Sequence, residues 1–300
     1  MRAAAAAAVL LAAAAVTGCG APPGPAQPPA TRAAAPAPQH RYLGVSSPGG
    51  MPGVARFAAA TGTHPDLVSW YAGWYEPFDA GAVRAAGAWG AMPLIFLDSG
   101  RVPLTVIASR PSAWLAGYAR AVAAWGKPVA ISFDSEFNGP WWPWSFQHET
   151  PAVFTAAWRR VVATFRQAGA SNVTWVWTVA ASSPVTTALG PWWPGAAWVD
   201  WAGVNAYYTT AGATFARVFA RTLRDIARVT PAPVLVTETG ASPAAGRARS
   251  IASLFAGVES TPGVLGFIWF DYDKAPAHDW RIDDDPAALA AFRAAAREYG

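Results

Sequence analysis

The chain has 300 residues, of which 53% are hydrophobic and 13% are charged, and its formal net charge is +4. This composition allows one large domain with a sizeable core, or two small domains. No run of lysine or arginine alternates with aromatic residues, so we expect no nucleic-acid binding. The 17 tryptophans are the unusual feature. They favour a protein that contacts carbohydrate over one that binds nucleotides, because flat aromatic rings pack on the apolar faces of sugars.

The first 19 residues resemble a bacterial lipoprotein signal peptide. Arg2 supplies a positive charge, residues 3–16 form an apolar stretch that is too short for a stable membrane span, and Cys19 follows a small residue. Cys19 is the only cysteine, which excludes an intramolecular disulfide. Lipidation of Cys19 would anchor the protein in the membrane. The alternative is an ordinary secretory signal, so we expect an extracytoplasmic protein that is lipid-anchored to the bacterial cell membrane or secreted.

Residues 20–40 are rich in alanine and proline, which predicts an unfolded linker. The folded domain is expected over residues 41–300, where short apolar runs alternate with segments of helical periodicity. Eight runs have the length and composition of buried parallel strands. They cover residues 42–46, 67–71, 93–97, 129–133, 173–178, 201–205, 234–238 and 264–270.

Between these runs, apolar residues recur at helical spacing, for example over residues 153–165, 215–226 and 251–258. Asp285 followed by Pro286 is typical of a helix N-terminus. Eight strands that alternate with helices over about 260 residues predict an α/β fold, a (β/α)8 TIM barrel. The alternative is an open doubly wound sheet, which usually carries a GxGxxG loop after its first strand. This chain has SSPGGMPG there.

In a TIM barrel the functional side chains lie at the C-terminal ends of the strands. Glu136 follows the fourth predicted strand and Glu238 closes the seventh, while Asp98 and Trp74 with Glu76 follow others. Two carboxyl groups beside tryptophan and tyrosine side chains meet the needs of glycoside hydrolysis, which uses a proton donor and a nucleophile or base. The alternative for the stretch around Glu136 is a tryptophan-rich loop packed on the core, with Glu136 solvated.

Residues 136–144, EFNGPWWPW, resemble the acid/base segment of glycoside hydrolase family 26, a β-mannanase family of retaining barrel enzymes. The resemblance extends over residues 42–300. Residues 156–178 are similar to the fourth helix and fifth strand of the family, 199–208 to the sixth strand, 237–240 to the nucleophile segment, and 266–284 to the last strand and closing turn. The resemblance implies a retaining endo-β-glycosidase without a cofactor, with β-1,4-mannan as the candidate substrate.

The resemblance also implies roles for individual residues. Glu136 matches the acid/base and Glu238 the nucleophile. Tyr207 matches a tyrosine that contacts the nucleophile and the sugar, and Trp269 matches a platform under the sugar on the non-reducing side of the cleaved bond. The expected substrate-binding residues are Asn138, Trp141, Trp144, Trp177, Tyr207 and Trp269.

Three positions depart from the family pattern. Ser135 stands where the family usually has a histidine, Ser132 stands where an arginine is common, and Asp134 adds a carboxyl group that would raise the proton affinity of Glu136 if it faced the cavity. A serine hydroxyl reaches less far than an imidazole and carries no charge. These changes leave the polysaccharide open, including one of the cell's own envelope. They also motivate a second hypothesis, a surface carbohydrate-binding lipoprotein that has lost turnover.

The other polar residues give weaker signals. The four histidines show no metal-ligand spacing, so we expect no metal site. Asp271, Asp273 and the run 283–285 fit turns and helix caps better than calcium. Trp192 and Trp193 fit either a distal sugar platform or loop packing, and no glycine-flanked serine indicates a serine hydrolase. We expect a monomer whose partners are a polysaccharide and the membrane.

Overall fold

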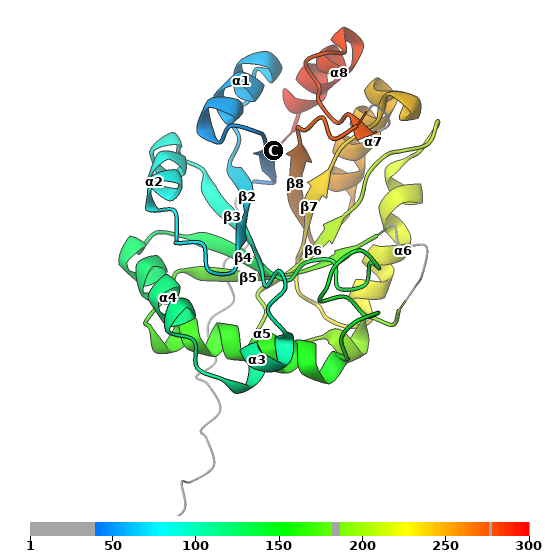
Figure 1. Cartoon of the computed structure of the whole chain (residues 1–300). Coiled ribbons are helices and arrows are strands. Elements are labelled where there is room, and N and C mark those ends of the chain that lie inside the picture. Colours follow the sequence, from blue (N-terminus) through cyan, green and yellow to red (C-terminus); the bar gives the residue numbers. More distant parts are fainter. Residues whose placement is uncertain (1–39, 182–186, 276–277, 300) are drawn as a thin grey trace, which may run out of the picture. The chain divides into compact units, whose positions relative to one another are not determined.

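The computed structural model describes residues 40–181, 187–275 and 278–299. Eight parallel strands form one closed barrel in the order β1 to β8, and Figure 1 shows the helices around the outside of this barrel. The predicted (β/α)8 fold is therefore confirmed. The predicted signal peptide, Cys19 and residues 20–39 of the predicted linker lie outside the described residues, so all of them stay predictions.

All eight predicted strands are present, and each observed strand extends at most two residues beyond its predicted bounds. The barrel closes because β1 pairs in parallel with both β2 and β8. The strands are β1 (Tyr42–Ser46), β2 (Leu67–Gly73), β3 (Met92–Asp98), β4 (Val129–Phe133), β5 (Val173–Ala180), β6 (Trp201–Asn205), β7 (Val234–Thr239) and β8 (Val264–Phe270).

Helices connect the strands, and several begin at a side chain that caps the first turn. Thr150 and Asp285 each accept a backbone N–H of their own helix, and Asp285 is followed by Pro286 as the sequence predicts. The helices are α1 (Met51–Thr61), α2 (Ala80–Trp89), α3 (Leu104–Ser109), α4 (Ala113–Trp125), α5 (Pro151–Gln167), α6 (Phe215–Ala227), α7 (Arg247–Ser260) and α8 (Pro286–Ala296), with short 3-10 turns η1 (Gly190–Trp192) and η2 (Pro243–Ala245).

Alternation along the strands divides the core into two layers. One layer fills the barrel with Leu67, Leu94, Phe96, Ala130, Val176, Trp201, Leu235, Leu265 and Ile268. The other lies between the strands and the helices and holds the largest buried rings, among them Trp158, Trp175, Trp177 and Trp269. Because the barrel is filled, its interior has no room for a site, and the C-terminal ends of its strands are where an active site is expected.

Within the three described ranges, no helix combines the length and the apolar character needed to cross a membrane. The same residues contain no group of three or more histidine, cysteine, aspartate or glutamate side chains that could hold a metal ion.

Candidate active site

Glu238 faces the barrel mouth because β7 is irregular. The pairing of β7 with β8 shifts between Val236 and Thr239. Val236 belongs to the outer layer, so strict alternation would point Thr237 inward and Glu238 outward. The bulge turns both inward: the Thr237 hydroxyl donates to Asn205 Oδ1 at 2.6 Å, and Glu238 accepts hydrogen bonds across the mouth. A bulge beside an active site commonly re-aims a side chain in this way.

The Glu238 carboxylate is held on both oxygens by tyrosine hydroxyls. Tyr207 donates to Oε2 at 2.7 Å, and Tyr71 donates to Oε1. Only 4% of Glu238 is exposed. Burial and the charge of Glu136 raise the pKa of Glu238 to about 7, against the two hydrogen bonds and the charge of Lys274, which lower it. Glu238 therefore changes its charge near neutral pH.

Glu136 sits on a tight turn directly after β4. Its backbone has φ 60° and that of Asp134 has φ 44°, which non-glycine residues rarely adopt and which costs on the order of 1–3 kcal/mol each. The turn is fixed by its own backbone bonds. The Glu136 N–H donates to the Thr178 carbonyl at 2.9 Å, and the Gly139 N–H donates to the Glu136 carbonyl at 2.8 Å. This turn directs the Glu136 side chain across the mouth.

Three N–H groups bind the Glu136 carboxylate. Asn205 Nδ2 donates to Oε1 at 2.9 Å, while the indoles of Trp141 and Trp142 donate to Oε2 at 2.7 and 3.1 Å. The bond from Thr237 to Asn205 Oδ1 fixes which end of the amide faces Glu136. A continuous path of hydrogen bonds therefore runs from Glu136 through Asn205 to Thr237, the neighbour of Glu238, and brings the two glutamates to one site.

A third carboxyl group, Asp98, lies at the end of β3. Burial and the charges of Glu238, Glu136 and Glu76 raise the pKa of Asp98 to about 7. Its Oδ1 atom is buried and has no hydrogen-bond partner among the described residues. The mouth therefore contains a third carboxyl group besides the two predicted glutamates.

Asn138 and Trp144 lie beneath the site rather than in it. The Asn138 amide donates to the Ala180 carbonyl at 2.7 Å and accepts the Ala180 N–H at 2.8 Å, so both of its ends are used on the backbone of β5. Trp144 is buried, stacks on Trp142 and donates to the Ser135 carbonyl at 2.8 Å. Their predicted sugar contacts are therefore wrong, and both residues support the loop that carries Glu136.

The predicted sugar contacts of Trp177 and Trp269 are also wrong. Both side chains have 0% exposure. Trp177 packs on Phe137 and Trp193, and Trp269 packs on Phe292 of α8. Alternation is the physical reason, since both tryptophans stand at strand positions that face the helices.

Two predicted contacts lie at the site. Trp141 is 43% exposed and binds Glu136, and Tyr207 binds Glu238. The sequence reasoning did not select Tyr71, Trp142 or Asn205. Tyr71 and Asn205 could have been found from alternation. Each lies four residues after an inward-facing residue of its strand, Leu67 in β2 and Trp201 in β6, and therefore faces inward as well.

Two of the three departures from the family pattern are bound to neighbouring segments. Ser132 is buried and donates to Thr178 Oγ1 at 2.8 Å. Asp134 is buried and accepts the Ser99 N–H at 2.7 Å, which ties it to the segment after β3. The expected effect of Asp134 on Glu136 depended on its facing the site, and its carboxylate is directed to Ser99 instead.

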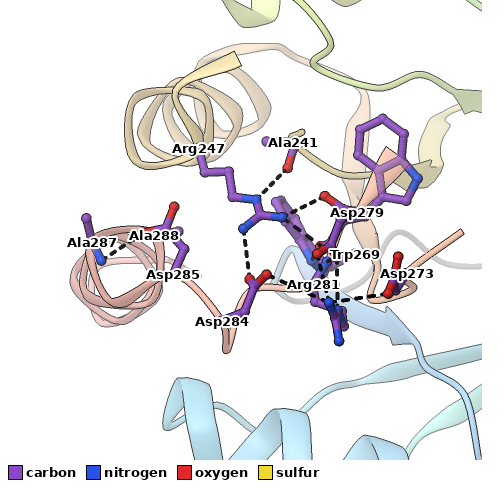
Figure 2. Close-up of polar contacts among 11 residues, drawn as sticks. Ala241, Arg247, Trp269, Asp273, Asp279, Arg281, Asp284, Asp285, Ala287 and Ala288 are labelled. Carbon is purple, nitrogen blue, oxygen red and sulfur yellow. Dashed lines mark hydrogen bonds and ion pairs between the residues drawn. The ribbon is translucent and has the colours of Figure 1, made fainter. Parts of the chain in front are cut away.

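An ion-pair network fastens the segment between β8 and α8, as Figure 2 shows. Arg247 is buried and donates to the carbonyls of Ala241 and Asp279 and to the Asp284 carboxylate, at 3.0, 2.7 and 2.8 Å. Arg281 pairs with Asp279 at 2.8 Å and with Asp273 at 3.4 Å. Asp273, Asp279 and Asp284 thus serve ion pairs, and Asp285 caps α8.

This network positions a further aromatic residue of the site. Trp280, next to Asp279, lies with its ring centroid 4.6 Å from that of Tyr207, at an interplanar angle of 31°. Tyr207 in turn binds Glu238.

Trp192 does not lie at the site. It is buried and stacks on Phe137, with ring centroids 5.0 Å apart, which favours loop packing over a distal sugar platform.

Comparison with known proteins agrees with this geometry. Residues 114–247 match the family model of glycosyl hydrolase family 26. The chain is 29% identical to Endoglucanase H of Acetivibrio thermocellus over 201 residues, which are 62% of this chain and 22% of that protein. It is 33% identical to the β-1,3-xylanase TXYA of a Vibrio species over 90 residues, 29% of this chain and 18% of that protein. The chain thus spans about a fifth of the length of these relatives.

Solved structures share the fold. An endo-β-1,4-mannanase double mutant from Cellulomonas fimi superposes with a TM-score of 0.67 at 18% identity, covering 86% of this chain and 70% of that one. A family 26 β-mannanase from Bacteroides ovatus gives 0.64 at 15% identity, covering 86% and 88%. At such identities these structures confirm the barrel fold alone.

Proposed function

We propose that this chain is a glycoside hydrolase of family 26 that cleaves a β-linked polysaccharide internally, with retention of configuration at the anomeric carbon. The observation that carries the proposal is the meeting of Glu136 and Glu238 at one barrel mouth, joined through Asn205 and Thr237. The family match over residues 114–247 supports the same reaction class.

In the first step of the proposed mechanism, a Glu238 oxygen attacks the anomeric carbon while the Glu136 carboxyl group gives its proton to the departing sugar oxygen. The glycosidic bond breaks and a glycosyl ester forms on Glu238. In the second step, Glu136 takes a proton from water, the water oxygen attacks the anomeric carbon, and Glu238 leaves as a carboxylate. A retaining enzyme needs its two carboxyl groups about 5–5.5 Å apart.

The proposed substrate class is a β-linked mannan, glucan or xylan. The similar solved proteins are described as mannanases, whereas the curated relatives are described as an endoglucanase and a xylanase. Tyr71 and Trp141 present exposed ring surface beside the two glutamates, as expected for stacking on sugars. β-1,4-Mannan stays the first candidate.

We also propose that the enzyme acts outside the cytoplasm, anchored through a lipid on Cys19. The proposal rests on the resemblance of residues 1–19 to a lipoprotein signal. Cell fractionation of the natural chain and of Cys19→Ser tests it. We expect only the natural chain in the membrane fraction, and equal distribution of both would contradict the anchor.

The experiment that tests the enzymatic function is reducing-sugar release from β-mannan, mixed-linkage glucan and xylan by the part of the chain from about residue 41 onward. We expect release from at least one of them by the natural sequence and none by Glu238→Ala. With sodium azide and an activated aryl β-glycoside, Glu238→Ala should form a glycosyl azide of inverted configuration. Tight binding without release by the folded natural sequence would instead favour a carbohydrate-binding lipoprotein.

A further inference from the structure

Tyr71 reaches the nucleophile from the far side of the barrel. It belongs to β2, whereas Tyr207 follows β6, and in a closed barrel of eight strands in sequential order these two strands lie opposite each other. The Tyr71 hydroxyl donates to Glu238 Oε1 and the Tyr207 hydroxyl to Oε2. Each oxygen of the Glu238 carboxylate is thus bound by a different tyrosine, which fixes the orientation of the carboxylate group.

The Tyr71 hydroxyl stays a proton donor under ordinary conditions. Burial of the hydroxyl and the charges of Glu238, Glu136 and Asp98 raise the pKa of Tyr71 well above its usual value. A phenol that keeps its proton gives a permanent hydrogen bond to a carboxylate. Bonds of this kind stabilise the ionised form of the acceptor.

The Tyr71 ring has a second contact that fixes its position. It stacks on Phe96 of β3, with ring centroids 5.0 Å apart and an interplanar angle of 22°. Phe96 is fully buried in the barrel interior. Tyr71 itself is 41% exposed, so one side of the ring is anchored on the core while the rest of the side chain is open beside Glu238.

We propose that Tyr71 is a positioning residue for the nucleophile Glu238. The proposal rests on the proposed function. By holding Oε1, Tyr71 directs the carboxylate at the anomeric carbon in the first step. In the second step the electron pair of the breaking ester bond returns to Glu238, and the same O–H group stabilises the carboxylate as it reforms.

The test is Tyr71→Phe, which keeps the ring and its stacking on Phe96 but removes the hydroxyl. Loss of a hydrogen bond to a charged group predicts a fall in kcat of about tenfold or more. The acidic limb of the kcat/KM profile should move to higher pH, because Glu238 loses a bond that favours its ionised form. Tyr75→Phe is the matched control, since Tyr75 is an exposed tyrosine in the turn that follows β2, and it should leave both quantities unchanged.

A second readout does not need turnover. The chain contains six glutamates, so carbon-13 labelling of their carboxyl groups allows the titration of Glu238 to be followed by NMR, with Glu238→Gln assigning its signal. We expect Glu238 to titrate at higher pH in Tyr71→Phe than in the natural sequence and in Tyr75→Phe. An unchanged titration of Glu238 in Tyr71→Phe would overturn the positioning role. Absence of turnover by the natural sequence on every glycan would instead overturn the proposed function.

Discussion

The two glutamates of the site are held in different surroundings. Glu136 lies on a loop, is half-buried and is bound by N–H groups, two of them from tryptophans of the same loop. Glu238 lies on a strand, is almost fully buried and is bound by O–H groups from β2 and from the segment after β6. The difference fits the two proposed tasks, because a proton donor must meet leaving groups and water, while a nucleophile must keep a fixed position.

The surroundings also set a pH requirement. Glu238 must be ionised to attack, and its pKa is raised to about 7 by burial and by the charge of Glu136. Activity should therefore rise as the pH increases through about 7. Three variants test the different roles and surroundings of the two glutamates.

The largest effect is expected for Glu136→Ala. On a natural polysaccharide, loss of the proton donor should lower kcat by about 10²–10⁴-fold. On a dinitrophenyl β-glycoside, whose leaving group needs no proton, the first step should stay close to that of the natural sequence. The measurement is burst kinetics with added azide, which should restore the second step and give a glycosyl azide of retained configuration. Equal losses on both substrates would contradict the assignment of Glu136 as the acid.

A smaller effect, on stability, is expected for Glu238→Gln. The folded pKa of about 7 lies above the ordinary value of 4.5. Between these values the folded state keeps a proton that the unfolded state has released, so stability falls as the pH rises and the full cost is present above about 7. Glutamine cannot ionise, so the free energy of unfolding at pH 8 should exceed that of the natural sequence by up to about 3 kcal/mol, with no gain at pH 4.

Urea unfolding at both pH values measures this difference. Glu259→Gln is the matched control, because Glu259 is exposed and its replacement should change the free energy of unfolding little at either pH. A gain for Glu238→Gln that is the same at pH 4 and pH 8 would show that the charge of Glu238 is not its cause.

The smallest effect is expected for Trp141→Phe. The variant removes one N–H from Glu136 Oε2, while Trp142 and Asn205 still bind the carboxylate. Loss of one such bond at an exposed position predicts a fall in kcat/KM of about 5–10-fold. Trp142→Phe and the double variant complete a cycle. Independent effects of the two indoles would show that each acts on Glu136 separately.

The sequence predicted the barrel and the positions of its two glutamates at strand ends, because strand composition and the position of strand ends are local properties. It failed where the direction of a side chain decided the outcome. Trp177 and Trp269 stand at strand ends but face the helices, whereas Tyr71, one residue after Trp70, faces the mouth. The alternation of side chains along a strand would have given the correct direction for all three residues.

The direction in which the two glutamates face could not be found from alternation. Glu238 faces inward only because β7 changes its pairing with β8 between Val236 and Thr239. Glu136 reaches the mouth through a backbone conformation that its residue type disfavours. Both depend on contacts between strands far apart in the sequence, which the local pattern does not contain.

The ion pairs around Arg247 have a consequence for the conditions that the protein tolerates. Dissolved salt weakens attractions between charges that water surrounds, and it acts much less on charges that water does not reach. Arg247 is 4% exposed, and it holds the segment that bears Trp280 against Tyr207. The contact between Trp280 and Tyr207 should therefore persist at high salt concentration, whereas ion pairs between exposed side chains would weaken.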